Sequence, residues 1–159
     1  MELSMMIKIF GVFVSIFAFS VYLDTPKKHI FKAGLVGAIG GFVYLITFQI
    51  SESDVAASFF SALAAAFVSH VFARVFKTPV TLFLVAGILP TVPGAGMYRT
   101  VHHILVKDEA MAAYYMIQTL EIAGVIAFAI FLMDSVFRAA QIGEWKKVIL
   151  KYRHKADLK

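Results

Sequence analysis

Long apolar runs separated by short polar segments make up most of this chain. A helix needs roughly 20 apolar residues to cross a bilayer core about 30 Å thick. Five runs come near or exceed that length, so we expect an all-α integral membrane protein with about five transmembrane helices. The expected spans cover residues 5–23, 33–50, 55–72, 79–106 and 111–137. They form a predicted transmembrane domain over residues 1–142, followed by a basic cytoplasmic tail over residues 143–159.

The fourth run begins like the others and is then interrupted. Pro90, Pro93, Gly94 and Gly96 fall within seven residues. Residues 79–89 rise roughly 16 Å at 1.5 Å per residue, so we expect the break near the bilayer midplane. Irregular backbone at that depth is tolerated where it is buried in protein or lines a polar cavity, and transporters use such breaks as binding sites. The alternative is a plain proline kink whose backbone groups are satisfied by neighbouring helices.

The break is expected to offer two kinds of backbone group to a ligand. Because Pro90 and Pro93 have no N–H, the carbonyls of Ala86 and Leu89 lose their helical donors and become available to a cation or an ammonium group. The glycines permit unusual dihedral angles and close backbone approach. A new helix starting near Ala95 points its N–H groups and positive dipole end at the same place, which suits a carboxylate. An amino acid zwitterion carries both charges.

Polar side chains follow the break within about one turn. Arg99 is placed to hold a substrate carboxylate in a bidentate pair, or else to act as a cation at the membrane interface. His102 and His103 are adjacent and face different directions on a helix, so we expect no metal site there. The predicted substrate-binding residues are Pro90, Pro93, Gly94, Gly96, Tyr98 and Arg99.

The fifth span carries an acidic residue among apolar ones. Tyr114, Gln118 and Glu121 lie on one helical face, and Glu121 is about ten residues into the span. An ionisable group at such depth is costly and suggests a function. Glu121 and Gln118 are therefore candidates for proton coupling. The alternatives are a Glu121 ion pair with Arg99 or with a partner subunit, and a structural hydrogen bond from a protonated carboxyl group.

Small residues recur every four positions on the second and third spans, a pattern that lets helix backbones approach closely. These stripes predict either tight internal packing or, for one of the two on the third span, the docking of a separate membrane partner. The helix-packing residues are Ala33, Gly37 and Gly41 on the second span, and Ala57, Ser61 and Ala65 on the third, where a second stripe runs through Ser58, Ala62, Ala66 and His70.

The charges predict the orientation of the chain in the membrane. Twelve of the 15 Lys and Arg residues fall after spans one and three or in the region around the tail, whereas the loop after span two carries Glu52 and Asp54. The positive-inside rule then places the N-terminus outside and the C-terminus in the cytoplasm, which five spans satisfy. Asp134 lies four residues before Arg138, which predicts an ion pair on the helix surface.

Composition narrows the possible functions. The chain is 60% hydrophobic and 16% charged, against about 25% charged for soluble domains. Its net charge of +5 gathers at the ends of apolar segments, so we expect no nucleic-acid partner, although the basic tail suits anionic lipid. The first span is also readable as a signal peptide, but the positive charge that should precede it is missing.

Several kinds of chemistry find no support in the sequence. The chain has no cysteine, which excludes disulfides and thiolate catalysis. It lacks His-Glu-x-x-His, Gly-x-Ser-x-Gly and a pair of intramembrane aspartates. We therefore expect no enzyme activity, no cofactor and no bound metal.

The motif at the break resembles one in a known family. Residues 88–98 read Ile-Leu-Pro-Thr-Val-Pro-Gly-Ala-Gly-Met-Tyr, similar to the Pro-x-x-Pro-Gly motif and following Tyr of the threonine/serine exporter family. The resemblance extends to the Asp-Thr-Pro-Lys-Lys turn at 24–28, the glycine-rich segment at 34–41 and the Ala-Arg to Lys-Thr-Pro segment at 73–79. In this order, these features resemble the small subunit of the split exporters, which is equivalent to the C-terminal half of the fused proteins.

The resemblance implies a function that the residues alone do not give. It implies a secondary transporter subunit that exports threonine and serine, or a dicarboxylate such as succinate, across a bacterial cytoplasmic membrane. It also implies a larger membrane partner subunit, and export driven by the membrane potential or the proton gradient. A scaffold that stabilises the larger subunit without transporting anything is the remaining alternative.

Overall fold

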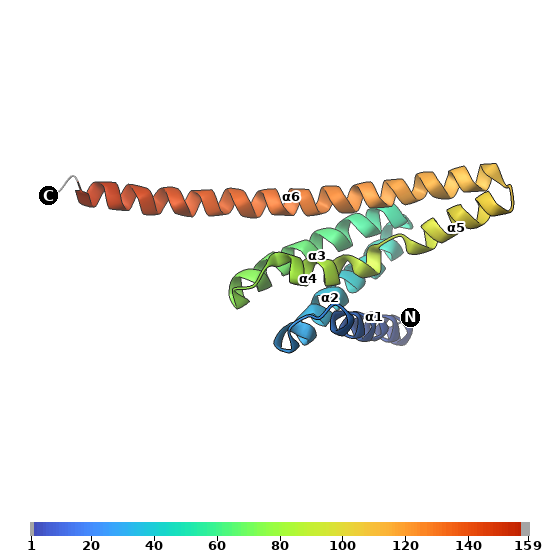
Figure 1. Cartoon of the computed structure of the whole chain (residues 1–159), viewed down its shortest axis with the longest axis horizontal. Coiled ribbons are helices and arrows are strands. Elements are labelled where there is room, and N and C mark those ends of the chain that lie inside the picture. The colour runs from blue at the N-terminus through green and yellow to red at the C-terminus, as the bar shows by residue number, and fades with distance from the viewer. Residues whose placement is uncertain (1, 157–159) are drawn as a thin grey trace.

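The computed structural model describes the backbone of residues 2–156 and the side chains of residues 6–140. Within that range the chain is all-α, with no strand. Seven helical elements follow one another: α1 (Glu2–Tyr22), α2 (Lys27–Ser51), α3 (Asp54–Phe76), α4 (Val80–Ile88), the short 3₁₀ helix η1 (Leu89–Thr91), α5 (Gly94–Leu105) and α6 (Glu109–Ala156). Figure 1 shows α6 as one long rod, with the shorter helices gathered along one side of it.

Short turns with one left-handed residue separate most of the helices. Glu52 and Lys77 have φ values of 50° and 52°, and the backbone N–H of each donates to a carbonyl four residues earlier. This geometry closes a helix and redirects the chain. Ser53 then caps α3, because its side chain accepts a hydrogen bond from the Ala56 N–H. Pro79 directly precedes α4, in keeping with the preference of proline for the beginning of a helix.

The helices have the length and composition of a multi-pass membrane protein. The helices α2 and α3, and residues 109–140 of α6, are each long and apolar enough to cross a bilayer. The segments Val80–Thr91 and Gly94–Leu105 are bent by 51° relative to each other and qualify together as a fourth, broken span. Residues 6–22 of α1 form a shorter apolar helix, so the first expected span, over residues 5–23, stays a prediction.

The helix α3 lies at the centre of the bundle and packs against α2, α4 and α6 (Figure 1). The side chain of Phe83 from α4 is fully buried in the core, where Val36 of α2 and Ala65 of α3 also lie. On the opposite side of α3, Ala62 packs against Ile126 and Ala129 of α6. These contacts make α3 the element through which the two sides of the bundle are joined.

The small-residue stripes are buried within the chain. A Cβ added to Gly37 would lie 2.6 Å from Ile16 of α1, so this stripe lets α1 and α2 approach closely. The first stripe of α3 faces α2, where the Ser61 hydroxyl donates a 2.7 Å hydrogen bond to the Gly40 carbonyl. The second stripe packs on α6 through Ala62. The expectation that one stripe of α3 docks a separate partner is therefore wrong, because both faces already have partners inside the chain.

The last helix is longer than the sequence pattern suggests. We expected a span over 111–137 and then a polar tail, but α6 continues to Ala156 over 48 residues. At 1.5 Å per residue it is roughly 72 Å long, more than twice the thickness of a bilayer core. Its first turns pair only with α5, and this α5–α6 hairpin runs past the end of α3 in Figure 1. The tail side chains that suit anionic lipid lie outside the described residues.

Candidate functional site

The break in the fourth span is a short, well-defined change of direction. The helix α4 ends at Ile88, one turn of 3₁₀ helix follows, and α5 begins at Gly94. Pro90 lies in the first turn of η1 and Pro93 directly precedes α5, so neither proline removes a hydrogen bond from the middle of a helix. The new helix thus begins where the sequence predicts it, within one residue of Ala95.

Most of the backbone carbonyls at the break accept a hydrogen bond from another group of the chain. The Leu89 carbonyl, which loses its α-helical donor at Pro93, accepts from the Val92 N–H at 3.3 Å. The Thr91 hydroxyl donates to the Ile88 carbonyl at 2.7 Å, and the Gly94 N–H donates to the Val92 carbonyl at 2.8 Å. The expectation that the Leu89 carbonyl is free for a ligand is therefore wrong.

The glycines at the break serve close packing rather than unusual backbone angles. No described glycine has a positive φ, so the expected unusual dihedrals of Gly94 and Gly96 are not present. A Cβ added to Gly96 would collide with the Thr119 hydroxyl of α6, whereas one added to Gly94 would meet nothing within 4 Å. Gly96 therefore lets α5 and α6 approach closely, and Gly94 has no such role.

The helix α4 reaches the middle of the bundle just before it breaks. Ala65 is the central residue of α3, and a Cβ added to Gly87 would lie 3.3 Å from it. The same Cβ would lie only 2.6 Å from the Val36 side chain. Gly87 is thus a close-packing position that the sequence analysis did not single out. The break begins two residues later, at Leu89, near the level of the middle of α3.

A small cavity, which we call the break cavity, lies beside this turn and has a volume of about 210 Å³. The helices α2, α3, α5 and α6 all contribute to its walls. Five predicted functional residues line it, namely Pro90, Pro93, Gly96, Arg99 and Gln118. Gly94, Tyr98 and Glu121 do not line it. The fold therefore brings together residues from the fourth and fifth spans that lie some 20 positions apart in the sequence.

The break cavity has an acidic and a basic group in its walls. Asp54 lies at the first position of α3, and its Oδ1 accepts a 2.7 Å hydrogen bond from the Tyr44 hydroxyl. Arg99 is exposed, and its guanidinium carbon lies 5.4 Å from the centroid of the Tyr115 ring. Among residues 6–140, neither Asp54 nor Arg99 forms an ion pair. Both charges are available to a ligand.

Tyr98 points away from this cavity. Its side chain is 71% exposed, and its ring stacks on that of His102 with the centroids 6.1 Å apart. His103 instead faces Asp108, 3.5 Å away. In the part of the chain with described side chains, no group of three His, Cys, Asp or Glu residues is arranged to hold a metal ion.

Glu121 lies in a different place from the one its sequence position suggests. It is exposed and lines a separate pocket with Glu52, Asp54 and Tyr114, at the loop between α2 and α3. Glu121 therefore lies beside this loop and not beside the middle of α3, because the first turns of α6 extend past the end of α3 (Figure 1). Among the described side chains Glu121 forms no ion pair, with Arg99 or any other residue. Its proton-coupling role stays a prediction.

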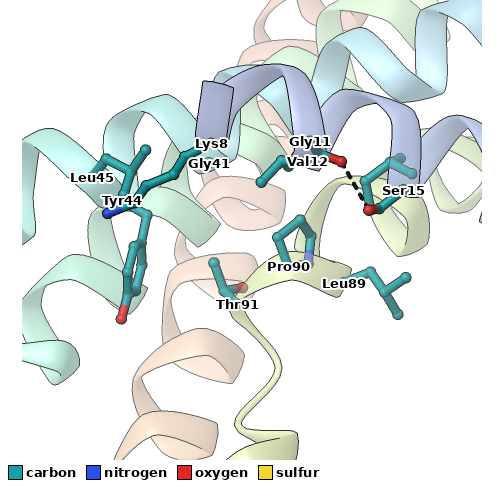
Figure 2. Close-up of a pocket in the computed structure, with 11 residues that line it drawn as sticks. Lys8, Gly11, Val12, Ser15, Gly41, Tyr44, Leu45, Leu89, Pro90 and Thr91 are labelled. Carbon is teal, nitrogen blue, oxygen red and sulfur yellow. Dashed lines mark hydrogen bonds between the residues drawn. The ribbon is translucent and has the colours of Figure 1, made fainter. Parts of the chain in front are cut away.

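A second cavity, which we call the α1 cavity, lies on the other side of the break between α1 and α2. Figure 2 shows Pro90 and Thr91 of η1 on one side of it and α1 on the other, with the Lys8 side chain extending towards Tyr44 and Leu45 of α2. Its volume is about 610 Å³, and most of its walls are apolar. Tyr44, Pro90 and Thr91 belong to both cavities, so these three residues form the partition between them.

At the other end of α3, two charged residues of α6 pair as the sequence predicts. Arg138 Nε lies 2.7 Å from Asp134 Oδ2, which confirms the expected i, i+4 ion pair. The second oxygen of Asp134 lies 3.7 Å from Nε2 of the buried His70. Arg74 donates a 3.0 Å hydrogen bond to the Phe137 carbonyl. This cluster ties the ends of α3 and α6 together.

Several residues of the break cavity could not be recognised from the sequence. Tyr44 and Asp54 occur in an apolar span and a polar loop with nothing to connect them, and Thr119 is one threonine among many apolar residues. Thr91 was detectable, because it stands between the two prolines of the motif. Asp54 carries a partial signal as one of only two charges in its loop, but a loop charge by itself predicts topology and not a site.

Fold and cavity together define a multi-pass, all-α membrane protein with a broken helix beside a charged cavity. Residues 8–136 match the family described as threonine/serine exporter, ThrE. The chain is also 30% identical over 135 residues to a threonine/serine exporter of Corynebacterium glutamicum. The chain therefore belongs to the threonine/serine exporter family, a family of transporters. This confirms the resemblance that the break motif predicts.

The similarity is unevenly shared between the two proteins. It covers 85% of this chain but 25% of the Corynebacterium protein, so the chain spans about a quarter of that relative's length. No solved structure matches this chain significantly.

Proposed function

We propose that this chain is the small subunit of a secondary transporter that exports threonine and serine across a bacterial cytoplasmic membrane. The observation that carries the proposal is the break cavity, which is lined by a broken helix and by two opposite charges that have no ion-pair partner among residues 6–140. Transporters build substrate sites in this way, from irregular backbone near mid-depth. Family membership supports amino acids as the substrate class.

The substrate site in this proposal consists of the residues that line the break cavity. Pro90 and Pro93 set the direction in which α5 leaves, Gly96 brings α5 against α6, and Arg99 holds the substrate carboxylate. Arg suits this task because its planar guanidinium can donate two parallel hydrogen bonds. The stack of Arg99 on Tyr115 supports a fixed position for the guanidinium group.

The proposal also includes a larger membrane subunit as partner. The family relative is about four times as long as the segment that this chain matches, which supports a second component that supplies the rest of the transport path. With the N-terminus outside and the C-terminus in the cytoplasm, the basic residues after α1 and α3 lie on the inner side, as the positive-inside rule requires. The tail then lies against anionic lipid of the inner leaflet.

Threonine efflux from intact cells tests this function. Cells of the bacterium that carries the gene, and of a strain from which the gene has been deleted, are preloaded with a threonine-containing peptide. The threonine that appears outside the cells is followed over time. The proposal predicts that threonine stays trapped in the deletion strain and leaves again after complementation. Equal efflux from both strains would contradict it, and a succinate efflux assay on the same strains then tests the dicarboxylate alternative. If the two strains also release succinate equally fast, the result favours the alternative in which this chain is a scaffold that transports nothing.

A further inference from the structure

We infer that Asp54 binds the α-ammonium group of the exported substrate, so that the break cavity selects amino acids over dicarboxylates. The inference rests on the proposed function, because it assigns a substrate class to the same cavity. Asp54 is not part of the motif at the break and enters the cavity from α3. Its role follows from how the acidic and basic groups are arranged in the cavity walls.

Asp54 and Arg99 line the same small cavity. Its volume of about 210 Å³ lies below the roughly 300–1,000 Å³ typical of drug-sized ligand sites. A metabolite of a few heavy atoms therefore fills it. Asp54 comes from the wall formed by α3, and Arg99 from the wall formed by α5. A molecule with a carboxylate and an ammonium group on one carbon matches this pair of opposite charges.

The environment of Arg99 suits a carboxylate. Among the described residues no acidic side chain pairs with it, so its donors remain available. The 12-residue helix α5 also begins at this cavity, and its first turn contributes Ala95 and Gly96 to the wall. The positive end of the helix dipole therefore adds to the charge of the guanidinium group. This side of the cavity is the anion-binding side.

The environment of Asp54 suits an ammonium group. Tyr44 engages Oδ1, and no hydrogen bond from a described residue reaches Oδ2. An ionised carboxylate has about four lone-pair positions, so a single tyrosine donor leaves most of its capacity unused. Asp54 lies in the first turn of α3, where the helix dipole points its positive end. Gln118 adds an amide that can both donate and accept.

Asp54 also discriminates against a dicarboxylate. A dicarboxylate that places one carboxylate on Arg99 brings its second towards Asp54 within the same small cavity. Like charges placed together in this way are unfavourable, and such repulsion is a common basis of specificity. The same molecule also leaves Oδ2 of Asp54 without a donor. The cavity therefore favours the zwitterion on both counts.

Transport by inside-out membrane vesicles tests this inference on the intact complex. Vesicles are prepared from source cells that express the wild-type chain, from the deletion strain, and from strains with Asp54→Asn or Glu52→Gln. Glu52 is the matched control, because it is an acidic residue two positions away that does not line the break cavity. Uptake of labelled threonine is measured alone and against an excess of its desamino analogue, which keeps the carboxylate and the hydroxyl group.

The inference predicts two results. Asp54→Asn lowers threonine uptake by roughly ten- to a hundredfold, the loss expected for one charge-assisted hydrogen bond, whereas Glu52→Gln keeps wild-type uptake. In wild-type vesicles, an excess of unlabelled threonine competes with the label, and the desamino analogue does not.

Other results would overturn it. Wild-type uptake by Asp54→Asn, or competition by the desamino analogue as strong as that by threonine, means that the ammonium group is not recognised at Asp54. The analogue experiment needs only the wild-type chain, so it can still overturn the inference if Asp54→Asn fails to reach the membrane. Equal threonine uptake by wild-type and deletion vesicles would instead remove the proposed function, and the inference with it.

Discussion

The hydroxyl group of Tyr44 donates a 2.7 Å hydrogen bond to Oδ1 of Asp54, ten positions further along the chain. This bond joins the last third of α2 to the first turn of α3 across the short loop between them. Tyr44 also separates the break cavity from the α1 cavity. One contact thus fixes the acidic wall of the break cavity and the partition behind it.

Removal of this donor should weaken the bundle. We expect Tyr44→Phe to lower the free energy of unfolding by about 1.5–3 kcal/mol, the usual contribution of a hydrogen bond to a charged acceptor. The measurement is thermal unfolding of the purified chain in detergent. Tyr22→Phe is the control, since Tyr22 is 81% exposed and makes no side-chain hydrogen bond among the described residues. Equal unfolding temperatures for both variants would show that the Tyr44 bond contributes nothing.

The two glycines at the start of α5 should respond differently to the same substitution. Gly96→Ala places a methyl group against the Thr119 hydroxyl, which already donates a 2.6 Å hydrogen bond to the Tyr115 carbonyl. We expect a loss of roughly 1–3 kcal/mol, as for other overpacked sites, and a lower efflux rate. Gly94→Ala meets open space and should unfold and transport like the wild type.

A second substitution separates close packing from other effects at Gly96. Thr119→Ala removes the hydroxyl group that the new methyl group would meet, so the Gly96→Ala, Thr119→Ala double variant should regain most of the lost stability. If the double variant unfolds as early as Gly96→Ala, the clash with Thr119 is not the cause.

Gly87 should be equally intolerant of a side chain. A methyl group there lies 2.6 Å from Val36 and presses on a fully buried part of the core. We expect Gly87→Ala to cost roughly 1–3 kcal/mol in thermal unfolding. Gly124→Ala, at an exposed position of α6 with nothing within 4 Å of the added atom, should be neutral or slightly stabilising. Similar losses at both positions would contradict the close approach of α4 to α2.

Arg99 should matter for transport and not for folding. We expect Arg99→Ala to reduce threonine efflux to the level of the deletion strain, while the protein remains in the membrane in normal amounts. Arg99→Lys should restore little, because an ammonium group cannot form the bidentate pair. Lys107→Ala, which removes an exposed cation beyond the end of α5, is the control. Normal threonine efflux by cells with Arg99→Ala would contradict the proposal that Arg99 is part of the substrate site.

Much of the fold follows from local patterns in the sequence. The apolar runs predict both ends of α3 and the start of α4 to within four residues, whereas α2 begins six residues before the expected second span. The Pro-x-x-Pro-Gly motif predicts the break, and the four-residue spacing predicts the Asp134–Arg138 pair. Each of these features depends on residues close together in the chain, which is why sequence reasoning finds them.

The contents of the break cavity depend instead on how the helices are offset along one another. Glu121 was expected to be deep because it lies ten residues into its span, yet α6 begins well beyond the end of α3 and leaves Glu121 exposed. Asp54 lines the cavity for the same reason, because the offset between the helices places the first turn of α3 beside Gln118 of α6. No pattern within a single helix gives this offset. The donors found for the Ile88 and Leu89 carbonyls likewise come from the geometry of the turn.

The central claim, that threonine occupies the break cavity, is tested most directly by protection of an introduced thiol. The chain has no cysteine, so Ala95→Cys provides a single reactive group in the cavity wall, and Tyr98→Cys provides one outside it on the same helix. The rate at which a small, charged thiol reagent labels the chain is measured in isolated membranes with and without threonine. We predict that threonine slows labelling of Ala95→Cys and leaves that of Tyr98→Cys unchanged. Labelling of Ala95→Cys at the same rate with and without saturating threonine would contradict the account.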